Sequence, residues 1–564
     1  MRLALLLPLL CLAACAPAPP PAEPFDERAG ADARRIEADV RFLADDLLEG
    51  REAGTRGFDL AALYVAQRMR AIGVRPAGDA RGYFQTVPLL RGTRVEEGSR
   101  LVVTRDGATT ALRYREQFLP ALNYNAPDSE ITAPAVFVGQ AVHAPELKQD
   151  DFTGIDVRGK IAVLFAGAPA RFDNDRRAFY SSTREKLATL ESRGAVGVVF
   201  VATDEEEARR PWTRSAENWN KPGMRLRREA SPLLGRREAS PLGGRHPDNG
   251  VIDGFPQLKV VASVHSASAD VLLATEGRSA SQLFAQAKAG TLRGFDLPGT
   301  ITLSARTAIA PATSRNVVGV LPGRGALAKE HVVFTAHLDH VGIGAPVNGD
   351  AIYNGALDNA LGVAVMLEAA QRMATQAERP QRSILIVAVT AEEKGLLGAE
   401  WFAQHPTVAR GSLVANVNMD MPVLLVPTRD IVPIGVEHST LKGVVEQAAR
   451  EVGLALTPDP LPEETVFVRS DQYAFVRAGI PAVKLNGGVR SARLNRDASA
   501  PTRSFLKDHY HQPGDDANQP IQYADAARLA RLNARIGTLI ANTTDRPKWN
   551  DGDFFGVKFA PPAK

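Results

Sequence analysis

From Asn316 onward the chain alternates between β-rich runs and helical stretches, and this alternation constrains its fold more than any other feature. The β-rich runs are HVVFTAHLDH, RSILIVAVTAEE, SLVANVNMD and IPAVKLN, with the composition of strands buried on both faces. Helical stretches such as NALGVAVMLEAAQRMAT and YADAARLARLNARIGTLIAN lie between or after them. The pattern predicts an α/β fold with a mixed, mainly parallel sheet and helices on both faces.

Acidic and imidazole side chains lie at the ends of three of these runs. His337 and Asp339 end the first run, Glu392 and Glu393 the second, and Asp420 the third. In sheets of this kind, ligands bind beyond the carboxyl ends of the strands. The side chains are therefore expected to meet at one edge of the sheet, and this is the strongest internal indication of a functional site.

Two histidines and three carboxylates form a candidate metal-binding set: His337, Asp358, Glu393, Asp420 and His511. Five such ligands can hold two divalent ions if one carboxylate bridges them. Imidazole and carboxylate together suit zinc, cobalt or manganese. Glu392 is adjacent to the candidate ligand Glu393, and a glutamate beside a metal-bound water can act as a general base.

Each motif has a simpler explanation when it is taken alone. HLDH can be a polar strand end, and Asp358 with Asn359 a helix N-cap. Glu392 and Glu393 can be a solvated first helical turn, and Asp420 a turn residue. These explanations are independent of one another, so their coincidence at strand ends favours a site.

The amino terminus predicts export from the cytoplasm. Arg2 precedes an apolar run from Leu3 to Ala14, which is too short to span a membrane as a mature helix. Residues 12–15, Leu-Ala-Ala-Cys, resemble a bacterial lipoprotein box, which implies a signal peptide over residues 1–14 and lipid on Cys15. The Ala/Pro-rich residues 15–30 would be a flexible tether. The expected location is the cell envelope, on the periplasmic face or the cell surface; the alternative is an ordinary cleaved secretory signal.

Composition limits the remaining function classes. A length of 564 residues predicts two or three domains. Lys plus Arg number 67 and Asp plus Glu 64, a balance that gives no reason to expect nucleic acid or an anionic membrane as a partner. Cys11 and Cys15 are the only cysteines, so no disulfide is expected after residue 15. After the first run, no apolar run approaches membrane-spanning length.

An inserted module is expected at residues 132–303, between two parts of the main domain at residues 31–131 and 304–545. Its short β-rich runs include GKIAVLFAG and GVVFVA, and REKLATLESRG suggests a helix. Within it, RREASPLLG at Arg227–Gly235 is nearly repeated by RREASPLGG at Arg236–Gly244. This repeat is interpreted as a solvated loop lengthened by duplication, or alternatively as a basic contact surface. Residues 546–564 are assigned to a carboxyl-terminal tail.

The order of the motifs resembles that of the di-zinc aminopeptidases, a family that also includes glutamate carboxypeptidase-like enzymes. The match runs through HLDH, LDNALG, TAEEKG, NMD and YHQPGDD, and the resemblance covers residues 36–90 and 313–542. The inserted module resembles a protease-associated domain through GKIAVLFAG, the Lys186–Gly194 helix and GAVGVVFV. The resemblance implies two Zn²⁺ per chain and a peptide substrate.

The resemblance also implies a role for each metal ligand. Asp358 would bridge the two ions, His337 and Asp420 would complete one zinc site, and Glu393 and His511 the other. These five side chains would then account for both ions without any further protein ligand.

Three further residues acquire roles around the metals. Glu392 would be the general base, and Asp339 would fix the ring of His337 through a hydrogen bond. Tyr510 would hold the developing oxyanion, as a tyrosine does in some relatives, or else be a packed aromatic at the rim.

Two other positions are compared with the family pattern. Ser470-Asp471-Gln472 stands where relatives often carry Ser-Asp-His, which leaves the role of the third residue open. His340 is expected to be structural or a rim contact.

An aminopeptidase is the leading hypothesis, because the carboxylates at the site would receive a substrate ammonium group. A carboxypeptidase would need arginines to bind a free carboxylate, for which Arg469, Arg490 and Arg493 are the candidates. A glutaminyl cyclase-like acyltransferase with one zinc, or a non-catalytic binding protein, are further alternatives. The complete set of ligands and base argues against both.

Overall fold

The computed structural model describes residues 30–227, 255–492 and 498–560. The lipoprotein segment with Cys15, the tandem repeat apart from Arg227, and Arg493 lie outside the described residues. Within them, sixteen strands form one mixed sheet, whose main path runs β19-β18-β20-β17-β13-β16-β12-β5-β8-β9-β11-β4. No helix of the described part is both long enough and apolar enough to cross a membrane.

The strands of this sheet are β1 (Arg75–Pro76), β2 (Phe84–Arg105), β3 (Ala108–Ala111), β4 (Phe118–Pro120), β5 (Asp128–Phe137), β8 (Ile161–Phe165), β9 (Gly197–Val201), β10 (Gly223–Leu226), β11 (Val260–Val264), β12 (Phe295–Leu321), β13 (His331–His337), β16 (Ser383–Val389), β17 (Leu413–Asn418), β18 (Asp430–Ile434), β19 (Ala455–Leu456) and β20 (Ala482–Gly487). Two hairpins stand apart: β6 (His143–Ala144) with β7 (Gln149–Asp150), and β14 (Gly342–Val347) with β15 (Asp350–Tyr353).

The α-helices are α1 (Ala31–Leu43), α2 (Arg56–Ile72), α3 (Asn174–Ser181), α4 (Thr183–Ser192), α5 (Asp204–Arg209), α6 (Trp212–Glu217), α7 (Ala269–Leu273), α8 (Ala280–Ala289), α9 (Leu361–Ala374), α10 (Leu397–Gln404), α11 (Leu441–Val452), α12 (Gln472–Arg477), α13 (Ser499–Asp508), α14 (Tyr523–Asn542) and α15 (Phe554–Phe559). Short 3₁₀ turns connect many of these elements. The residues assigned to a tail from the sequence thus include a short helix, α15.

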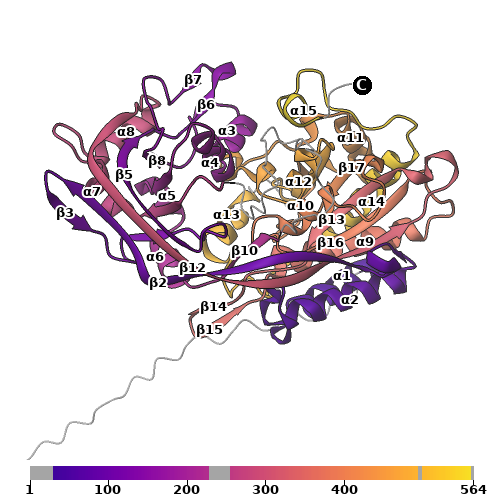
Figure 1. Cartoon of the computed structure of the whole chain (residues 1–564). Coiled ribbons are helices and arrows are strands. Elements are labelled where there is room, and N and C mark those ends of the chain that lie inside the picture. The colour runs from indigo at the N-terminus through magenta and orange to yellow at the C-terminus, as the bar shows by residue number, and fades with distance from the viewer. Residues whose placement is uncertain (1–29, 228–254, 493–497, 561–564) are drawn as a thin grey trace, which may run out of the picture.

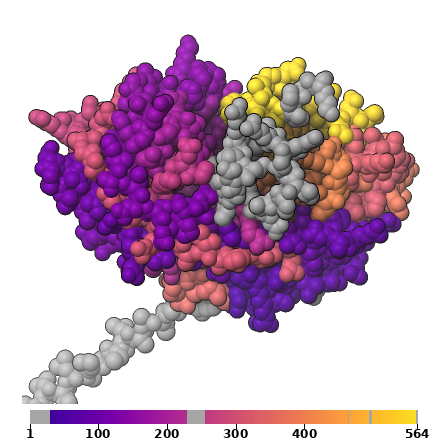
Figure 2. Space-filling view, viewed as in Figure 1, coloured from indigo at the N-terminus to yellow at the C-terminus, as the bar shows by residue number. Residues whose placement is uncertain are grey.

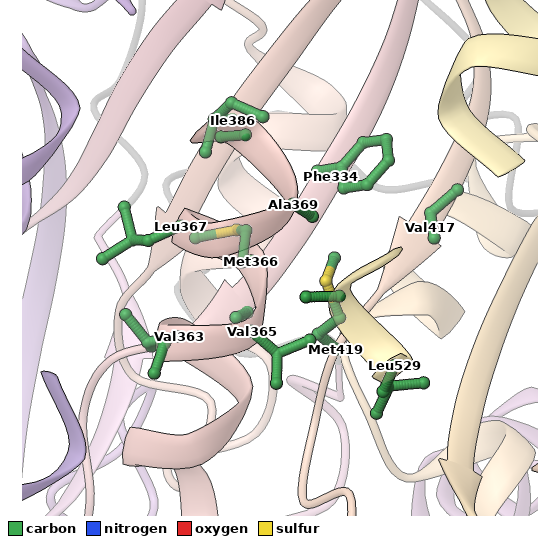
Figure 3. Packing of buried hydrophobic residues seen from close by; sticks show 14 of the residues in the cluster. Phe334, Val363, Val365, Met366, Leu367, Ala369, Ile386, Val417, Met419 and Leu529 are labelled. Carbon is green, nitrogen blue, oxygen red and sulfur yellow. The ribbon is translucent and has the colours of Figure 1, made fainter. Parts of the chain in front are cut away.

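One half of the sheet, called the first half, runs from β19 to β16 in the strand order. Its strands β16, β13, β17 and β20 are parallel and lie side by side. Alternate residues of β13 enter different cores: Val332 and Phe334 pack on one face, Val333 on the other. Helices α1, α2, α9, α11 and α14 cover the first face, and α10, α12 and α15 the second. Figure 3 shows Phe334 and Val417 of the sheet with Met366 of α9 and Leu529 of α14. The predicted α/β fold with a mixed sheet and helices on both faces is confirmed.

The second half is built on the same principle around the parallel strands β5, β8, β9 and β11. Ile161 and Val163 of β8 pack on the face covered by α7 and α8, whereas Ala162 and Leu164 pack on the face covered by α4. On the face shown in Figure 2, one lobe is mostly purple to magenta, and the other combines orange and yellow segments with the indigo amino-terminal region. Each lobe thus has its own hydrophobic cores.

Two long antiparallel strands, β2 and β12, connect the halves (Figure 1). Leu303 of β12 packs in the second half and Val317 in the first, with a register shift against β2 between Ser304 and Arg306. The domain boundary predicted between residues 303 and 304 falls inside β12 and stays a prediction. Leu101 and Phe118, which precede the predicted inserted module, share its core.

Candidate metal centre

Three adjacent parallel strands deliver four of the candidate side chains to one sheet edge. His337 is the last residue of β13 and lies opposite Val389, the last residue of β16. Glu392 and Glu393 follow β16, and Asp420 follows β17. Because β16, β13 and β17 run in the same direction, their carboxyl ends coincide and their terminal side chains face a common space.

Two loops bring the remaining candidate ligands to this edge. Asp358 lies in the single turn Ala356–Ala360 that precedes α9, and its backbone is not helical. His511 follows α13 and has a φ of 54°. Asp358 is buried and His511 is about one-third exposed at the side chain, so the centre opens to solvent on the His511 side.

The five candidate ligands form two groups that share Asp358. Oδ1 of Asp358 lies 3.2 Å from Nε2 of His337, which in turn lies 3.1 Å from Oδ1 of Asp420. Oδ2 of Asp358 lies 3.2 Å from Nε2 of His511, which lies 3.0 Å from Oε2 of Glu393. Each oxygen of one carboxylate therefore belongs to a different group, as a bridging ligand requires.

These spacings fit divalent zinc. Ligand atoms about 2.0–2.1 Å from a tetrahedral zinc ion lie roughly 3.3 Å from each other. The four separations of 3.0–3.2 Å are close to this value. Imidazole nitrogen and carboxylate oxygen are also the donor types that zinc takes in catalytic sites. The residues of both groups thus fit divalent ions of the zinc type, with Asp358 common to the two groups.

Glu392 and Glu393 are neighbours in sequence but occupy different environments. His511 and His340 hold the pKa of Glu393 at about 2, although burial alone would raise it. Burial raises the pKa of Glu392 well above its usual range, and the charge on Glu393 adds to this effect. One buried carboxyl is thus stabilised as an anion while its neighbour favours the neutral acid, a separation typical of groups with different chemical roles.

Asp339 contacts the site differently from the expectation. Its backbone carbonyl, and not its carboxylate, lies 3.1 Å from Nδ1 of His337. The carboxylate instead accepts the backbone N–H groups of Glu392 at 3.1 Å and Glu393 at 3.3 Å. Burial raises the pKa of Asp339 to about 6. Asp339 therefore positions the loop that carries both glutamates.

His340 is fully buried at the centre and not at its rim. Its Nδ1 lies 2.9 Å from Oε1 of Glu393 and 3.9 Å from Oδ2 of Asp358. Oε2 of Glu393 faces His511, so the Glu393 carboxylate is held by one imidazole on each oxygen. The structural role expected for His340 is consistent with this contact to a candidate ligand.

Three supporting residues escaped sequence reasoning. Asp515 is the first of the two aspartates in the YHQPGDD motif, and it accepts the backbone N–H of Asp358 at 3.0 Å. Lys484 of β20 donates to Oδ2 of Asp420 at 2.9 Å. Arg51 is buried and donates to the carbonyl of Leu338 at 2.9 Å. Asp515 lies within a motif and was detectable, whereas Lys484 and Arg51 belong to ordinary sequence contexts.

The Ser470-Asp471-Gln472 segment binds the end of β17 through side-chain hydrogen bonds. The side-chain amide of Asn418, the last residue of β17, donates to Oγ of Ser470 at 2.7 Å and to Oε1 of Gln472 at 2.8 Å. Gln472 is fully buried and donates to the carbonyl of Phe467 at 2.9 Å. The third residue of this segment is thus a packing partner for the strand that carries Asp420.

A pocket extends from the metal-ligand groups along an aliphatic wall. Glu392, Tyr510 and Arg469 line it together with the candidate ligands His337, Asp358 and Asp420. The wall consists of aliphatic side chains: Met421, Val423, Val432, Leu461, Val466, Val489 and Leu506.

Tyr510 and Arg469 meet in this pocket. The Tyr510 hydroxyl lies 3.5 Å from the Arg469 guanidinium, too far for a strong hydrogen bond. Arg469 also donates to the carbonyl of Glu464. The exposed Arg490 is absent from the lining.

The edge of the parallel sheet thus carries two groups of imidazole and carboxylate ligands, linked by one shared carboxylate. Such an arrangement is typical of metal-dependent hydrolases. Residues 316–536 match the family model described as Peptidase family M28. The segment that carries the candidate ligands is thus similar to this peptidase family, as the resemblance of its motifs implied.

Similar proteins agree with this assignment. Aminopeptidase NAALADL1 of Mus musculus is 24% identical over 329 residues, which are 53% of this chain and 41% of the relative. A probable zinc metalloprotease of Pyrenophora tritici-repentis is 45% identical over 73 residues, 13% of this chain and 16% of the relative. The match thus spans less than half the length of these curated relatives. The solved aminopeptidase from Aneurinibacillus sp. strain AM-1 shares the fold, with a TM-score of 0.51, 18% identity and coverage of 91% of this chain and 97% of that one.

Proposed function

We propose that this chain is an extracytoplasmic aminopeptidase that uses two zinc ions. The observation that carries the proposal is the position of Asp358, whose two oxygens belong to separate groups of zinc-type ligands, with Glu392 lining the adjoining pocket. The family match of residues 316–536 and the names of the similar proteins support a metallopeptidase.

The side chains divide the work of peptide hydrolysis. When bound, the zinc pair supplies Lewis acidity and lowers the pKa of water. A carboxylate oxygen of Glu392 would take up a proton from water and return it to the leaving amine, because Glu392 lines the pocket beside the candidate ligands without belonging to either ligand group. Asp339 keeps Glu392 in place by accepting its backbone N–H. The Tyr510 hydroxyl would donate to the carbonyl oxygen as negative charge develops there.

The aliphatic wall of the pocket would determine which first residue of a peptide the enzyme prefers. An apolar first side chain of a peptide would displace water from Met421, Val423 and Leu506. The carboxylates at the same end of the pocket would attract the free ammonium of that residue. We therefore expect the enzyme to prefer peptides that begin with an aliphatic residue.

A carboxypeptidase is the second candidate, because Arg469 lines the pocket. The arrangement around Arg469 weakens this alternative: its guanidinium already contacts both the carbonyl and the carboxylate of Glu464. Arg490 does not line the pocket, so the described residues offer no arginine cluster there. One partly occupied arginine is a poorer receptor for a free carboxylate than a cluster would be.

One pair of modified peptides separates these candidates. A peptide that begins with leucine is offered in an amino-acetylated form and in a carboxyl-amidated form, and products are identified by mass spectrometry. An aminopeptidase cleaves the amidated form and not the acetylated form. The reverse pattern would establish a carboxypeptidase, and cleavage of neither form by zinc-loaded protein would reject peptidase activity.

The location and the second half complete the proposal. The Leu-Ala-Ala-Cys sequence supports lipid attachment at Cys15 and a place in the cell envelope. The parallel strands β5, β8, β9 and β11 are the part we propose to be a protease-associated domain. Peptides would then be the substrates of a membrane-tethered enzyme.

A further inference from the structure

A second cluster of metal-ligating side chains lies where the two halves meet, and it shares no residue with the centre described above. His438 belongs to the 3₁₀ turn Val436–His438 between β18 and α11. Asp175 belongs to α3 of the second half, and Asp553 caps α15 at the end of the chain. Asp175, Glu437 and His438 each offer a ligand atom within 4.8 Å of the other two.

The imidazole of His438 is held in a defined orientation. Its Nδ1 lies 2.7 Å from Oδ2 of Asp553, and its ring packs against Phe467 and Phe555, which also contact each other. The other nitrogen, Nε2, faces Oδ2 of Asp175 at 3.4 Å and Oε1 of Glu437 at 3.9 Å. His438 is only 4% exposed, and among the described residues its Nε2 has no hydrogen-bond partner.

These distances suit a shared ion better than a direct bond. A charged N–H group and a carboxylate in direct contact lie about 2.7–2.9 Å apart. Ligands of one zinc ion lie roughly 3.3 Å apart, close to the separation of His438 and Asp175. A metal-bound histidine also characteristically gives its other ring nitrogen to a carboxylate, as His438 does to Asp553.

We propose that His438, Asp175 and Glu437 form a further divalent metal site, of the zinc type, that joins the two halves of the molecule. Nε2 of His438 and one oxygen from each carboxylate would be the protein ligands. Glu437 is half-exposed, so water would complete the coordination. This ion would have a structural role, because the pocket lining contains none of its ligands.

The surroundings show what the ion would hold together. Phe179 of α3 is buried against the first half, with its ring centre 5.2 Å from that of Phe554. Arg176 of α3 lies over the Phe554 ring at 5.0 Å. These contacts are weak individually. An ion bound by Asp175 from one side and His438 from the other would fix α3 against the Val436–His438 turn, which Asp553 links to α15.

The test compares zinc content and thermal stability in the full chain. Asp175→Asn and Glu437→Gln each remove one ligand, and the exposed Asp551→Asn is the matched control. After equilibration in buffered zinc, elemental analysis should find about one zinc fewer per chain in each ligand variant than in the wild type and the control. Added zinc should raise the Tm of the metal-free wild type and control more than that of the ligand variants.

The result is independent of the peptidase proposal, because only the difference in zinc content is used. Equal zinc content in all four proteins would overturn the further site. In that case His438 would be an imidazolium that pairs with Asp553 and Asp175. Asp175→Asn would then lower the Tm by the same amount with and without zinc.

Discussion

At the scale of single residues, the centre depends on the different surroundings of two adjacent carboxyl groups, those of Glu392 and Glu393. Glu393 faces His340 and His511, while Glu392 lines the pocket. Both backbone N–H groups are bound by the carboxylate of Asp339. The orientation of the two glutamates is thus fixed through the main chain, and each side chain can take a different environment.

Replacing Glu392 by glutamine should lower turnover by about 10²–10⁴-fold, the range for loss of acid–base catalysis. The zinc content should stay unchanged, because Glu392 belongs to neither metal-ligand group. Glu393→Gln is the contrasting variant, and we expect it to lose zinc as well as activity. Elemental analysis together with steady-state kinetics measures both effects. Near wild-type turnover in Glu392→Gln would remove it from the mechanism.

A buried lysine in the second half should make stability depend on pH. Burial lowers the pKa of Lys186 to about 7, and its ammonium donates to the carbonyls of Gln140 and Gly167. Between pH 7 and about 10.4 the unfolded chain holds this proton and the folded chain releases it, so this group makes stability rise with pH. The effect is on the order of 1 kcal/mol per pH unit and ends below pH 7.

Lys186→Met supplies the comparison. The difference in free energy of unfolding between wild type and variant should shift in favour of the wild type as the pH rises from 7 to 10. Chemical unfolding at several pH values measures this difference. A difference that does not change with pH would show that Lys186 keeps its proton throughout.

Sequence patterns predicted five candidate ligands that the fold brings together, because three of them end or follow strands and the other two lie in recognisable motifs. They could not locate Lys484 or Arg51, since a lysine in a strand and an arginine after a helix are common on surfaces. Burial of these cations is a property of the assembled fold. The same reason explains Asp339: the motif predicted that it lies beside His337, but its backbone conformation decided which atom makes the contact.

At the scale of elements, the close approach of helices to the sheet sets the geometry of the centre. Helix α14 packs against α9 and β13, and α9 follows the turn that carries Asp358. Gly537 of α14 lies directly over the Phe334 ring of β13. A Cβ atom at this position would lie 2.5 Å from Cζ of Phe334, closer than packed atoms allow.

Gly537→Ala should therefore destabilise the protein by about 1–3 kcal/mol, although alanine favours a helix. Gly443→Ala in α11 is the matched control, since a Cβ atom at this position would have no atom of another element within 4 Å. That variant should be more stable by up to about 1 kcal/mol. Thermal unfolding distinguishes the two, and equal stabilisation of both would show that α14 lies farther from β13.

At the scale of the whole molecule, the sequence predicted two building units but not how they are joined. Their apolar runs indicated a main domain and an inserted module, because short strands are the usual interpretation of interrupted β-rich runs. The 27-residue strand β12 contains polar and proline residues, such as Pro298 and Pro311, that suggest breaks. Pairing with β2 from Thr300 to Val317, and with β5 and β16 at the two ends, keeps β12 continuous, a long-range effect outside local sequence patterns.

The tether is expected to govern where the whole molecule resides. Cys15→Ser should remove the site of lipid attachment and shift the protein from the membrane fraction to the soluble fraction, or block its maturation. Fractionation and mass spectrometry of the mature amino terminus measure the outcome. Cys11→Ala is the control, because Cys11 lies within the expected signal peptide and would be removed with it. An unmodified terminus downstream of residue 15 in the wild type would contradict lipid attachment.

The continuity of β2 and β12 has a consequence for folding. A hinge between two domains requires a segment whose backbone can rotate without breaking hydrogen bonds, and the ladder of these strands continues from one hydrophobic core to the other. Heat that melts one core must release strands that belong equally to the other. The two cores should therefore unfold in a single calorimetric transition, and proteases should find no cleavage site in β2 or β12 that yields a folded half.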